Sequence, residues 1–246
     1  MNTQATLEQL KELKLNGMLQ AYQAVLQLPV HQHPDGHQLV AQLLHAEQQS
    51  RMHYRMLHYL RNAHLRYPAL IEEVEFNQER NLHKEQLFQL IDCAYIKRAE
   101  NILITGATGC GKSFLACALG YQACQMGYRV KYLNINKFIE KITLAKLDGS
   151  FVKLLDSLAK VQLLILDDFG LTPLDQNSRL ALLQVLEDRY GKYSVIVSSQ
   201  LPVNSWYEYL NEATLADAIM DRLVSKAHRF ELKGKSLRTK IIQKNN

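Results

Sequence analysis

The chain has 246 residues with a formal net charge of +5, and 47% of them are hydrophobic and 22% charged. This is the composition of an ordinary globular protein, long enough for one large domain or two small ones. No apolar run approaches the ~18 residues of a membrane span, and the first residues lack the basic and apolar regions of a secretion signal, so we expect a cytoplasmic protein without a membrane partner.

The N-terminal part of the chain reads as helices. "LEQLKELKLNGMLQAYQAVLQL" has apolar residues at helical spacing, interrupted at Asn16-Gly17, and the turn formers in "VHQHPDGH" predict a loop. A long helix is expected from about Leu39 to Arg66, and Tyr67-Pro68 is expected to stop it, because the residue before proline is pushed out of the helical region. We therefore predict an all-helical domain over residues 1–75.

One face of this long helix is polar and cationic. At 100° per residue, a single stripe contains Gln48, Arg51, Arg55, His58, Asn62 and Arg66. Arginines one turn apart can follow a phosphate backbone, although a solvated helix face explains such a stripe equally well. Arg51, Arg55 and Arg66 are our candidates for DNA contact. Because we find no helix-turn-helix, we expect recognition of backbone and shape.

From about Ile96 the pattern changes to alternating strands and helices. The strands are predicted at Asn101–Thr105, Arg129–Asn134, Leu163–Asp167, Ser194–Ser199 and His228–Leu232. Strands that alternate with helices favour a parallel sheet covered on both faces. The second predicted domain therefore spans residues 76–246.

A phosphate-binding loop follows the first of these strands. "GATGCGKS" matches the pattern G-x-x-x-x-G-K-[ST], with an apolar strand before it and a helix after it. Backbone N–H groups of such a loop surround phosphates, the lysine reaches the β- and γ-phosphates, and the serine hydroxyl is a ligand for Mg²⁺. The predicted nucleotide-binding residues are Gly106, Ala107, Thr108, Gly109, Cys110, Gly111, Lys112, Ser113 and Phe114.

Two acids end the third strand, in "VQLLILDDFG". An acid at the carboxyl end of a parallel strand lies where such sheets bind ligands. We expect Asp167 to hold Mg²⁺ and Asp168 to orient or deprotonate an attacking water. One of the two could instead be an ordinary turn or helix-cap aspartate.

The fourth strand ends in Ser198-Ser199-Gln200, beside the expected γ-phosphate position. A polar side chain there can sense the phosphate or fix the water, and Gln200 is the preferred candidate, followed by Ser199. An ordinary polar strand end remains the alternative.

The cysteines and the C-terminal charges bear on metal binding and on partners. Cys93, Cys110, Cys117 and Cys124 form no C-x-x-C pair, so we expect reduced thiols and no zinc site. Residues 221–246 hold eight Lys or Arg and two Asp or Glu, so the basic excess lies in the last 26 residues. Such a tail often meets polyanions, and a solvated terminus is the other interpretation.

The ordered motifs "GATGCGKS", "LLILDDFGL", "VIVSSQLP", "ADAIMDRLV" and "LKGKSLR" resemble the IstB-type insertion-sequence helper ATPases, a branch of the AAA+ superfamily related to the DnaC/DnaI helicase loaders. The resemblance covers nearly the whole chain. It implies an α/β fold, with a AAA+ core whose five-stranded parallel sheet is sandwiched by helices. No lid domain is expected, and a small all-helical domain precedes the core.

The resemblance also implies partners and further residues. It implies an ATP- and Mg²⁺-dependent ATPase that assembles as a homo-oligomer on double-stranded DNA, deforms it, and recruits and stimulates a transposase. Arg222 matches the arginine that completes a neighbour's site, although it could pair with Asp217, Asp221 or another acid instead. Arg238 resembles a nucleotide-sensing arginine, and a DNA-phosphate contact is its rival role.

One position departs from the AAA+ pattern. Most of these proteins carry Asp-Glu where this chain carries Asp167-Asp168. Because aspartate is one methylene shorter, we expect slow hydrolysis, stimulated by DNA. A replicative helicase loader and a non-hydrolysing DNA scaffold are the competing functions. The absence of cysteine before Cys93 disfavours a loader with a zinc module, and intact Lys112, Asp167, Asp168 and Arg222 disfavour the scaffold.

Overall fold

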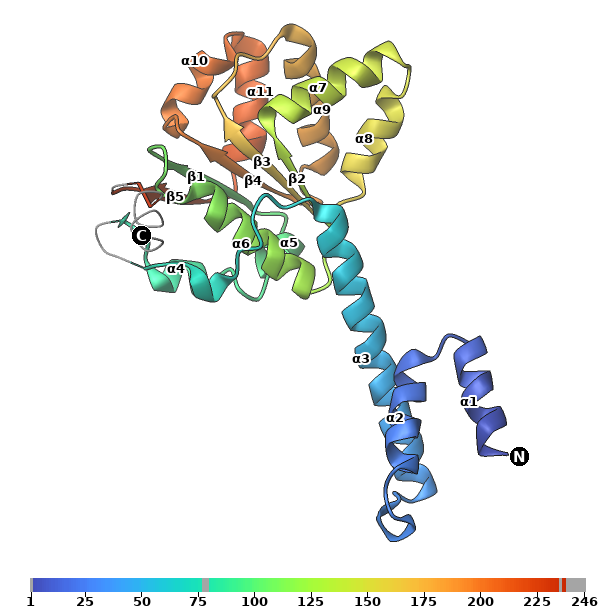
Figure 1. Cartoon of the computed structure of the whole chain (residues 1–246). Coiled ribbons are helices and arrows are strands. Elements are labelled where there is room, and N and C mark those ends of the chain that lie inside the picture. Colours follow the sequence, from blue (N-terminus) through green and yellow to red (C-terminus); the bar gives the residue numbers. More distant parts are fainter. Residues whose placement is uncertain (1, 77–79, 235, 238–246) are drawn as a thin grey trace, which may run out of the picture. The chain divides into compact units, whose positions relative to one another are not determined.

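The computed structural model describes residues 2–76, 80–234, 236 and 237 (Figure 1). The chain divides into two compact units, Met1–His58 and Tyr59–Asn246. The sequence placed the functional boundary after residue 75, and that division stays a prediction. Arg238 lies outside the described residues, as does most of the chain after residue 234 on which the expectation of no lid domain depends.

The N-terminal unit is helical, as expected. It holds α1 (Thr3–Glu12), α2 (Asn16–Leu26), η1 (Val30–Gln32) and the first part of α3 (Gly36–Ala63). The Asn2 side chain accepts from the backbone N–H of Gln4 and caps α1. The positive φ of 57° at Lys14 ends the first helical run, two residues before α2 begins.

Close approach of α2 and α3 depends on one glycine. A Cβ at Gly17 would lie 2.3 Å from the carbonyl oxygen of Ala46, so only glycine fits there without displacing the backbone. Beside this contact, the buried carboxylate of Glu47 accepts from the backbone N–H of Gly17 at 2.9 Å and of Met18 at 3.3 Å. The carboxylate therefore supplies the first turn of α2 with acceptors from a different helix.

The second unit is built on the predicted five-stranded sheet. Its strands are β1 (Asn101–Gly106), β2 (Val130–Asn134), β3 (Leu163–Phe169), β4 (Ser194–Ser199) and β5 (Ala227–Leu232), in the order β2-β3-β4-β1-β5. All four strand pairs are parallel. The fold class is therefore confirmed, and each strand begins within one residue of its predicted start.

Helices cover both faces of the sheet (Figure 1). One face packs against α4 (Lys84–Phe88), α5 (Ala94–Lys97) and α6 (Lys112–Gln125), with η2 (Ile71–Glu73) beside them. The other packs against α7 (Ile135–Leu147), α8 (Phe151–Ala159), α9 (Gln176–Arg189), α10 (Trp206–Leu210) and α11 (Ala213–Val224), with η4 (Val203–Ser205) leading into α10.

The strand side chains alternate between these two cores. Ile102 and Ile104 belong to the core around α6, whereas Leu103 belongs to the core around α9 and α11. Burial on both faces explains why the central strands read as continuous apolar runs.

The four cysteines and the tryptophan are buried. The four cysteines are buried and free, and burial raises the pKa of Cys93 and Cys124 to about 12. Trp206, the only tryptophan, packs edge-on against Phe169 with 4.9 Å between ring centroids, and its Nε1 donates to the Leu201 carbonyl.

Within the part of the chain that the structure describes, we find no helix with both the length and the apolar character of a membrane crossing.

Candidate nucleotide-binding site

The glycine-rich loop connects β1 to α6 at the carboxyl edge of the sheet. Gly111 is the N-cap of α6 and has φ of 94°, and a Cβ there would meet Arg80 Nη2 at 2.6 Å. The backbone conformation therefore favours glycine, and a larger residue would also displace the guanidinium of Arg80. The next residue, Lys112, is buried, and its Nζ donates to the carbonyl of Ala107 at 2.9 Å.

Arg80 braces this loop from outside the motif. Its Nη2 donates to the carbonyl of Cys110 at 2.7 Å, and its Nη1 donates to the carbonyl of Glu75 at 2.8 Å. The side chain is thus bonded to two carbonyls at once, one in the loop and one in the segment that precedes α4. Arg80 was not among the site residues predicted from the sequence.

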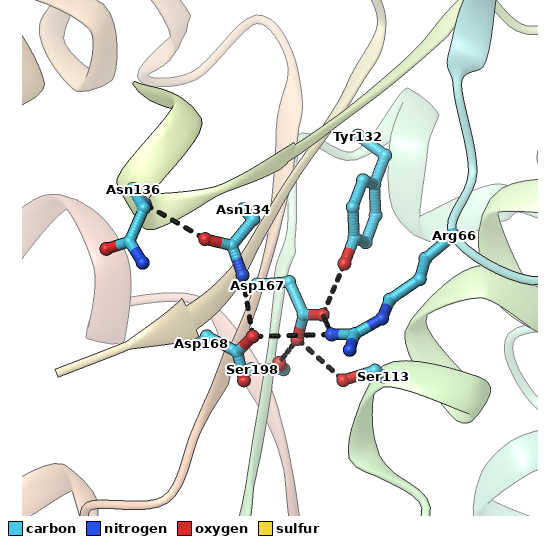
Figure 2. A network of polar contacts seen from close by, with 8 residues as sticks. All are labelled: Arg66, Ser113, Tyr132, Asn134, Asn136, Asp167, Asp168 and Ser198. Atoms are coloured by element: carbon cyan, nitrogen blue, oxygen red, sulfur yellow. Dashed lines mark hydrogen bonds and ion pairs between the residues drawn. The ribbon is translucent and has the colours of Figure 1, made fainter. Parts of the chain in front are cut away.

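Asp167 lies at the centre of the polar network in Figure 2 and is fully buried. Its Oδ1 accepts from Ser113 Oγ at 3.0 Å and from Ser198 Oγ, and its Oδ2 accepts from Tyr132 Oη. Burial raises the pKa of Tyr132, and the bond to Asp167 acts in the same direction. The hydroxyl is therefore a neutral donor to the carboxylate.

Asp168 interrupts the regular strand. Its φ is 57°, and the pairing of β3 with β4 shifts in register between Leu166 and Phe169. Successive side chains of a regular strand point to opposite faces, and the irregularity breaks that alternation. As a result, both carboxylates lie near one guanidinium: Arg66 Nη1 is 3.4 Å from Asp168 Oδ2 and 3.7 Å from Asp167 Oδ2.

Asn134 supplies the second contact to this acid. It is the last residue of β2, and its Nδ2 donates to Asp168 Oδ2 at 2.6 Å (Figure 2). Its own Oδ1 accepts from the backbone N–H of Asn136 and caps α7. The amide orientation is thereby set from both ends.

A cavity of about 580 Å³ opens beside the loop. Its lining includes the apolar side chains of Val74 and Leu82, the ring of Tyr67, and the polar side chains of Lys112, Ser113 and Asp168. Such a mixed lining suits a ligand that carries both a flat ring and a charged group. Gln200 also lines it, and its Oε1 accepts from Thr108 Oγ1 at 2.8 Å.

The structure brings most predicted site residues together. The loop residues 106–114, both aspartates and Gln200 surround or adjoin the cavity. Ser199, the second choice at that strand end, instead donates from its buried hydroxyl to the carbonyl of Phe169.

The oxygen atoms of Ser113 and Asp167 are suitable ligands for a divalent cation. Ser113 Oγ and Asp167 Oδ1 are 3.0 Å apart, and hydroxyl and carboxylate oxygens are the hard ligands that Mg²⁺ prefers. These two atoms would hold the ion together with phosphate oxygens of a bound nucleotide, and the ion would neutralise charge on those phosphates.

Arg222 lies at the opposite edge of the sheet. It is in the last turn of α11, and its carbonyl accepts from the side chain of Asn101, the first residue of β1. Its Nη2 is 2.6 Å from Glu187 Oε1, and its Nη1 is 3.3 Å from Asp221 Oδ2. The alternative pairing with acids of its own chain is therefore observed, and Arg222 does not line the cavity beside the glycine-rich loop.

The three candidate DNA contacts are separated. Arg51 and Arg55 are exposed on the part of α3 that belongs to the N-terminal unit, and Arg51 Nε donates to Glu47 at 2.7 Å. The predicted helix to Arg66 was too long, because α3 ends at Ala63 and His64 has φ of 53°. Arg66 therefore does not continue the helical stripe.

Sequence reasoning missed four residues at this edge: Arg66 as an acid contact, Arg80, Tyr132 and Asn134. Asn134 carried a usable signal, because it is a polar residue at a strand's carboxyl end, like Asp167 and Gln200. Tyr132 lies inside a strand, and the arginines come from segments without a regular pattern.

The chain is similar in sequence to known proteins. A family model described as "IstB-like ATP binding protein" matches residues 8–245. The "Putative insertion sequence ATP-binding protein y4pL" of Sinorhizobium fredii (strain NBRC 101917 / NGR234) is 40% identical over 233 residues, which are 95% of this chain and 95% of that protein.

Solved structures share the fold. The crystal structure of DnaI is similar with a TM-score of 0.58 at 17% identity, over 68% of this chain and 92% of that one. AMPPCP-bound DnaA from Aquifex aeolicus gives a TM-score of 0.61 at 20% identity, over 74% of this chain and 55% of that one, so the match spans about half of its length. The predicted AAA+ arrangement is thereby confirmed.

Proposed function

The chain belongs to the family of IstB-like ATP binding proteins, and from this premise we propose that it is an ATP-hydrolysing, DNA-binding helper of DNA transposition. The observation that carries the ATPase part is the pairing of Ser113 Oγ with Asp167 Oδ1 at 3.0 Å beside a glycine loop and a cavity of about 580 Å³. A triphosphate and its cation require this combination of groups in one place.

The residues divide the work as follows. Backbone N–H groups of the loop and the N-terminus of α6 bind phosphate oxygens, and Lys112 neutralises charge on the β- and γ-phosphates. Ser113 and Asp167 hold Mg²⁺. Asp168 accepts a proton from the attacking water, and Gln200, bonded to Thr108 in the loop, orients that water. The short side chain of Asp168 keeps turnover low.

Arg222 completes the site of a neighbouring subunit. It lies at the amino edge of the sheet, away from its own cavity, and its side chain is held by Glu187, which is 45% exposed. An arginine whose partner is an exposed carboxylate can exchange it for a phosphate at a subunit interface, which stabilises the charge of the transferring group. The active form is therefore a homo-oligomer with nucleotide between subunits.

DNA is the second ligand of this proposal. The exposed Arg51 and Arg55 on α3 and the basic residues of 221–246 supply cations for a phosphate backbone. The curated relative is named an insertion sequence ATP-binding protein, which supports a role beside a cognate transposase on double-stranded target DNA. Base-specific contacts are not part of the proposal.

Phosphate release by the purified chain tests the ATPase part. With Mg²⁺ and ATP we expect turnover below about 10 s⁻¹, the median for enzymes, rising with double-stranded DNA and lost with a chelator. No release under any of these conditions would contradict the proposal.

Co-purification tests the partner. The chain should retain its cognate transposase on DNA in the presence of a slowly hydrolysed ATP analogue. Retention of a replicative helicase in place of the transposase would instead support the loader function.

A further inference from the structure

Arg66 reaches the acid pair from a segment with no place in the nucleotide-binding motifs. Its Nη1 lies within 4 Å of both carboxylates, at 3.4 Å from Asp168 and 3.7 Å from Asp167. The hydroxyl of Tyr132 donates to the same oxygen of Asp167, Oδ2, that Arg66 approaches. One cation is thus shared by the two acids that the proposed function assigns to metal binding and proton transfer (Figure 2).

The backbone that carries Arg66 is anchored to the second unit. Ala63 is fully buried, and Leu65 and Tyr67 pack on the core around α6. This packing fixes the backbone position of Arg66, although the Arg66 side chain is 41% exposed.

The contacts divide the carboxylate oxygens into two sets. Serine hydroxyls approach Asp167 Oδ1, whereas Tyr132 and Arg66 approach Asp167 Oδ2. Asn134 and Arg66 likewise approach Asp168 Oδ2. On Asp167 the guanidinium thus approaches Oδ2, whereas Oδ1 accepts from Ser113 and Ser198.

We propose that Arg66 is a positioning residue for the acid pair, which orients Asp168 through its Oδ2 and limits the negative charge available to the metal ion. The inference rests on the proposed ATPase function. Without Arg66, Asp168 keeps Asn134 but loses the cation that aligns it with Asp167. The uncompensated charge at the two carboxylates rises by one unit, which attracts a divalent cation more strongly.

Two opposite changes are therefore expected in Arg66→Ala. The kcat for ATP falls about tenfold because the base is misplaced, with KM within about threefold. The Mg²⁺ concentration that half-saturates binding of a fluorescent, non-hydrolysable ATP analogue falls about threefold or more, because a repelling charge is gone. Damage to the fold alone would not strengthen cation binding while weakening turnover.

Two further variants sharpen the test. Arg66→Lys keeps the charge but loses the planar fork, so it should keep the wild-type Mg²⁺ dependence and show an intermediate kcat. Arg61→Ala removes an exposed cation five residues earlier and should change neither quantity. All variants are compared with wild type in the full-length chain, without and with double-stranded DNA.

The possible results distinguish the positioning role of Arg66 from its alternatives. If Arg66→Ala matches Arg61→Ala in kcat and in Mg²⁺ dependence, the positioning role is wrong. Loss of DNA affinity with unchanged hydrolysis in the absence of DNA would make Arg66 the DNA contact that the sequence predicted. Equal losses in Arg66→Lys and Arg66→Ala, with weaker Mg²⁺ binding in both, would indicate a structural role. Inactive wild-type protein would contradict the proposed function, and the Mg²⁺ titration would still test the inference.

Discussion

The two edges of the central sheet use charged groups in different ways. At the carboxyl edge, Lys112, Asp168 and Gln200 line a cavity of about 580 Å³. At the amino edge, Arg189 and Arg222 line a smaller cavity of about 110 Å³, and buried Arg189 donates to the backbone carbonyls of Leu158, Val161, Gln162 and Ser194.

The difference shows what makes a charged residue functional in this protein. Both terminal nitrogens of Arg189 donate to carbonyls at or before the starts of β3 and β4, and burial lowers the pKa of Arg189 to about 10. Arg222, at the same edge, is paired with the exposed Glu187 and can change partner. Lys112 and Asp168 line a space large enough for a ligand. Arg189 differs from Arg222 and Lys112 in its availability to a second molecule rather than in its charge.

Lys112→Ala should have the largest effect and isolates the carboxyl edge. Losing the cation at the β- and γ-phosphates should reduce ATP hydrolysis to background, more than about 10³-fold, and weaken nucleotide binding. Phosphate release and binding of a fluorescent ATP analogue measure both effects. Assembly of the variant on duplex DNA with wild-type strength and without nucleotide would contradict nucleotide-controlled assembly.

Arg222→Ala should reduce hydrolysis about 10³-fold while ATP binding persists, because in the proposed function this arginine acts on a neighbour's nucleotide. Mixing this variant with Lys112→Ala should restore part of the activity, since an intact loop in one subunit then meets an intact Arg222 in another. Mixtures with no activity at any ratio would place Arg222 outside the catalytic interface.

Arg189→Met should destabilise the fold without a specific effect on catalysis. It leaves four buried carbonyls without their charged donor, at a cost of about 3 kcal/mol or more. Thermal unfolding should shift by roughly 10 °C in a unit of this size. A normal melting temperature with lost hydrolysis would reverse the division between the two edges.

Asp168→Glu tests the short acid at the carboxyl edge. One additional methylene should bring the carboxylate closer to the attacking water and raise kcat about threefold, with a small loss of stability because Asp168 has φ of 57°. Steady-state phosphate release gives the rate. A lower rate would mean that the contacts of Asp168 with Asn134 and Arg66 matter more than its reach.

Glu100→Gln should have the smallest effect, at the amino edge. Hydrogen bonding to Arg98 lowers the pKa of Glu100 from 4.5 to about 2, with His228 contributing in the same direction. The stabilisation is therefore complete above pH 4.5 and is lost as the pH falls towards 2. Because Arg98 is 54% exposed, we expect about 1 kcal/mol or less near pH 7. The melting temperatures of variant and wild type should converge at low pH.

Regular features were predictable from the sequence. The alternation of strand-like and helical patterns located all five strands, and the spacing in "GATGCGKS" placed the loop at the end of β1. The proximity of Ser113, Asp167 and Gln200 also followed, because carboxyl ends of parallel strands meet at one edge.

Contacts made by irregular segments were not predictable in the same way. Arg66 was assigned to a helical stripe because the periodicity of α3 continues past Ala63, whereas the positive φ at His64 turns the chain towards the acids. Arg80 depends on the path of a loop, and a pattern of residue types does not encode that path. Asn134 could have been predicted, because it is a polar residue at the carboxyl end of a parallel strand, as Asp167 is.

Trp206 gives this protein a built-in optical probe. Its indole packs on Phe169, the residue directly after Asp168, and the chain has no other tryptophan. Any rearrangement of the acid pair that displaces the end of β3 alters the surroundings of one chromophore. Stopped-flow emission from unlabelled material would then time that rearrangement separately from phosphate release.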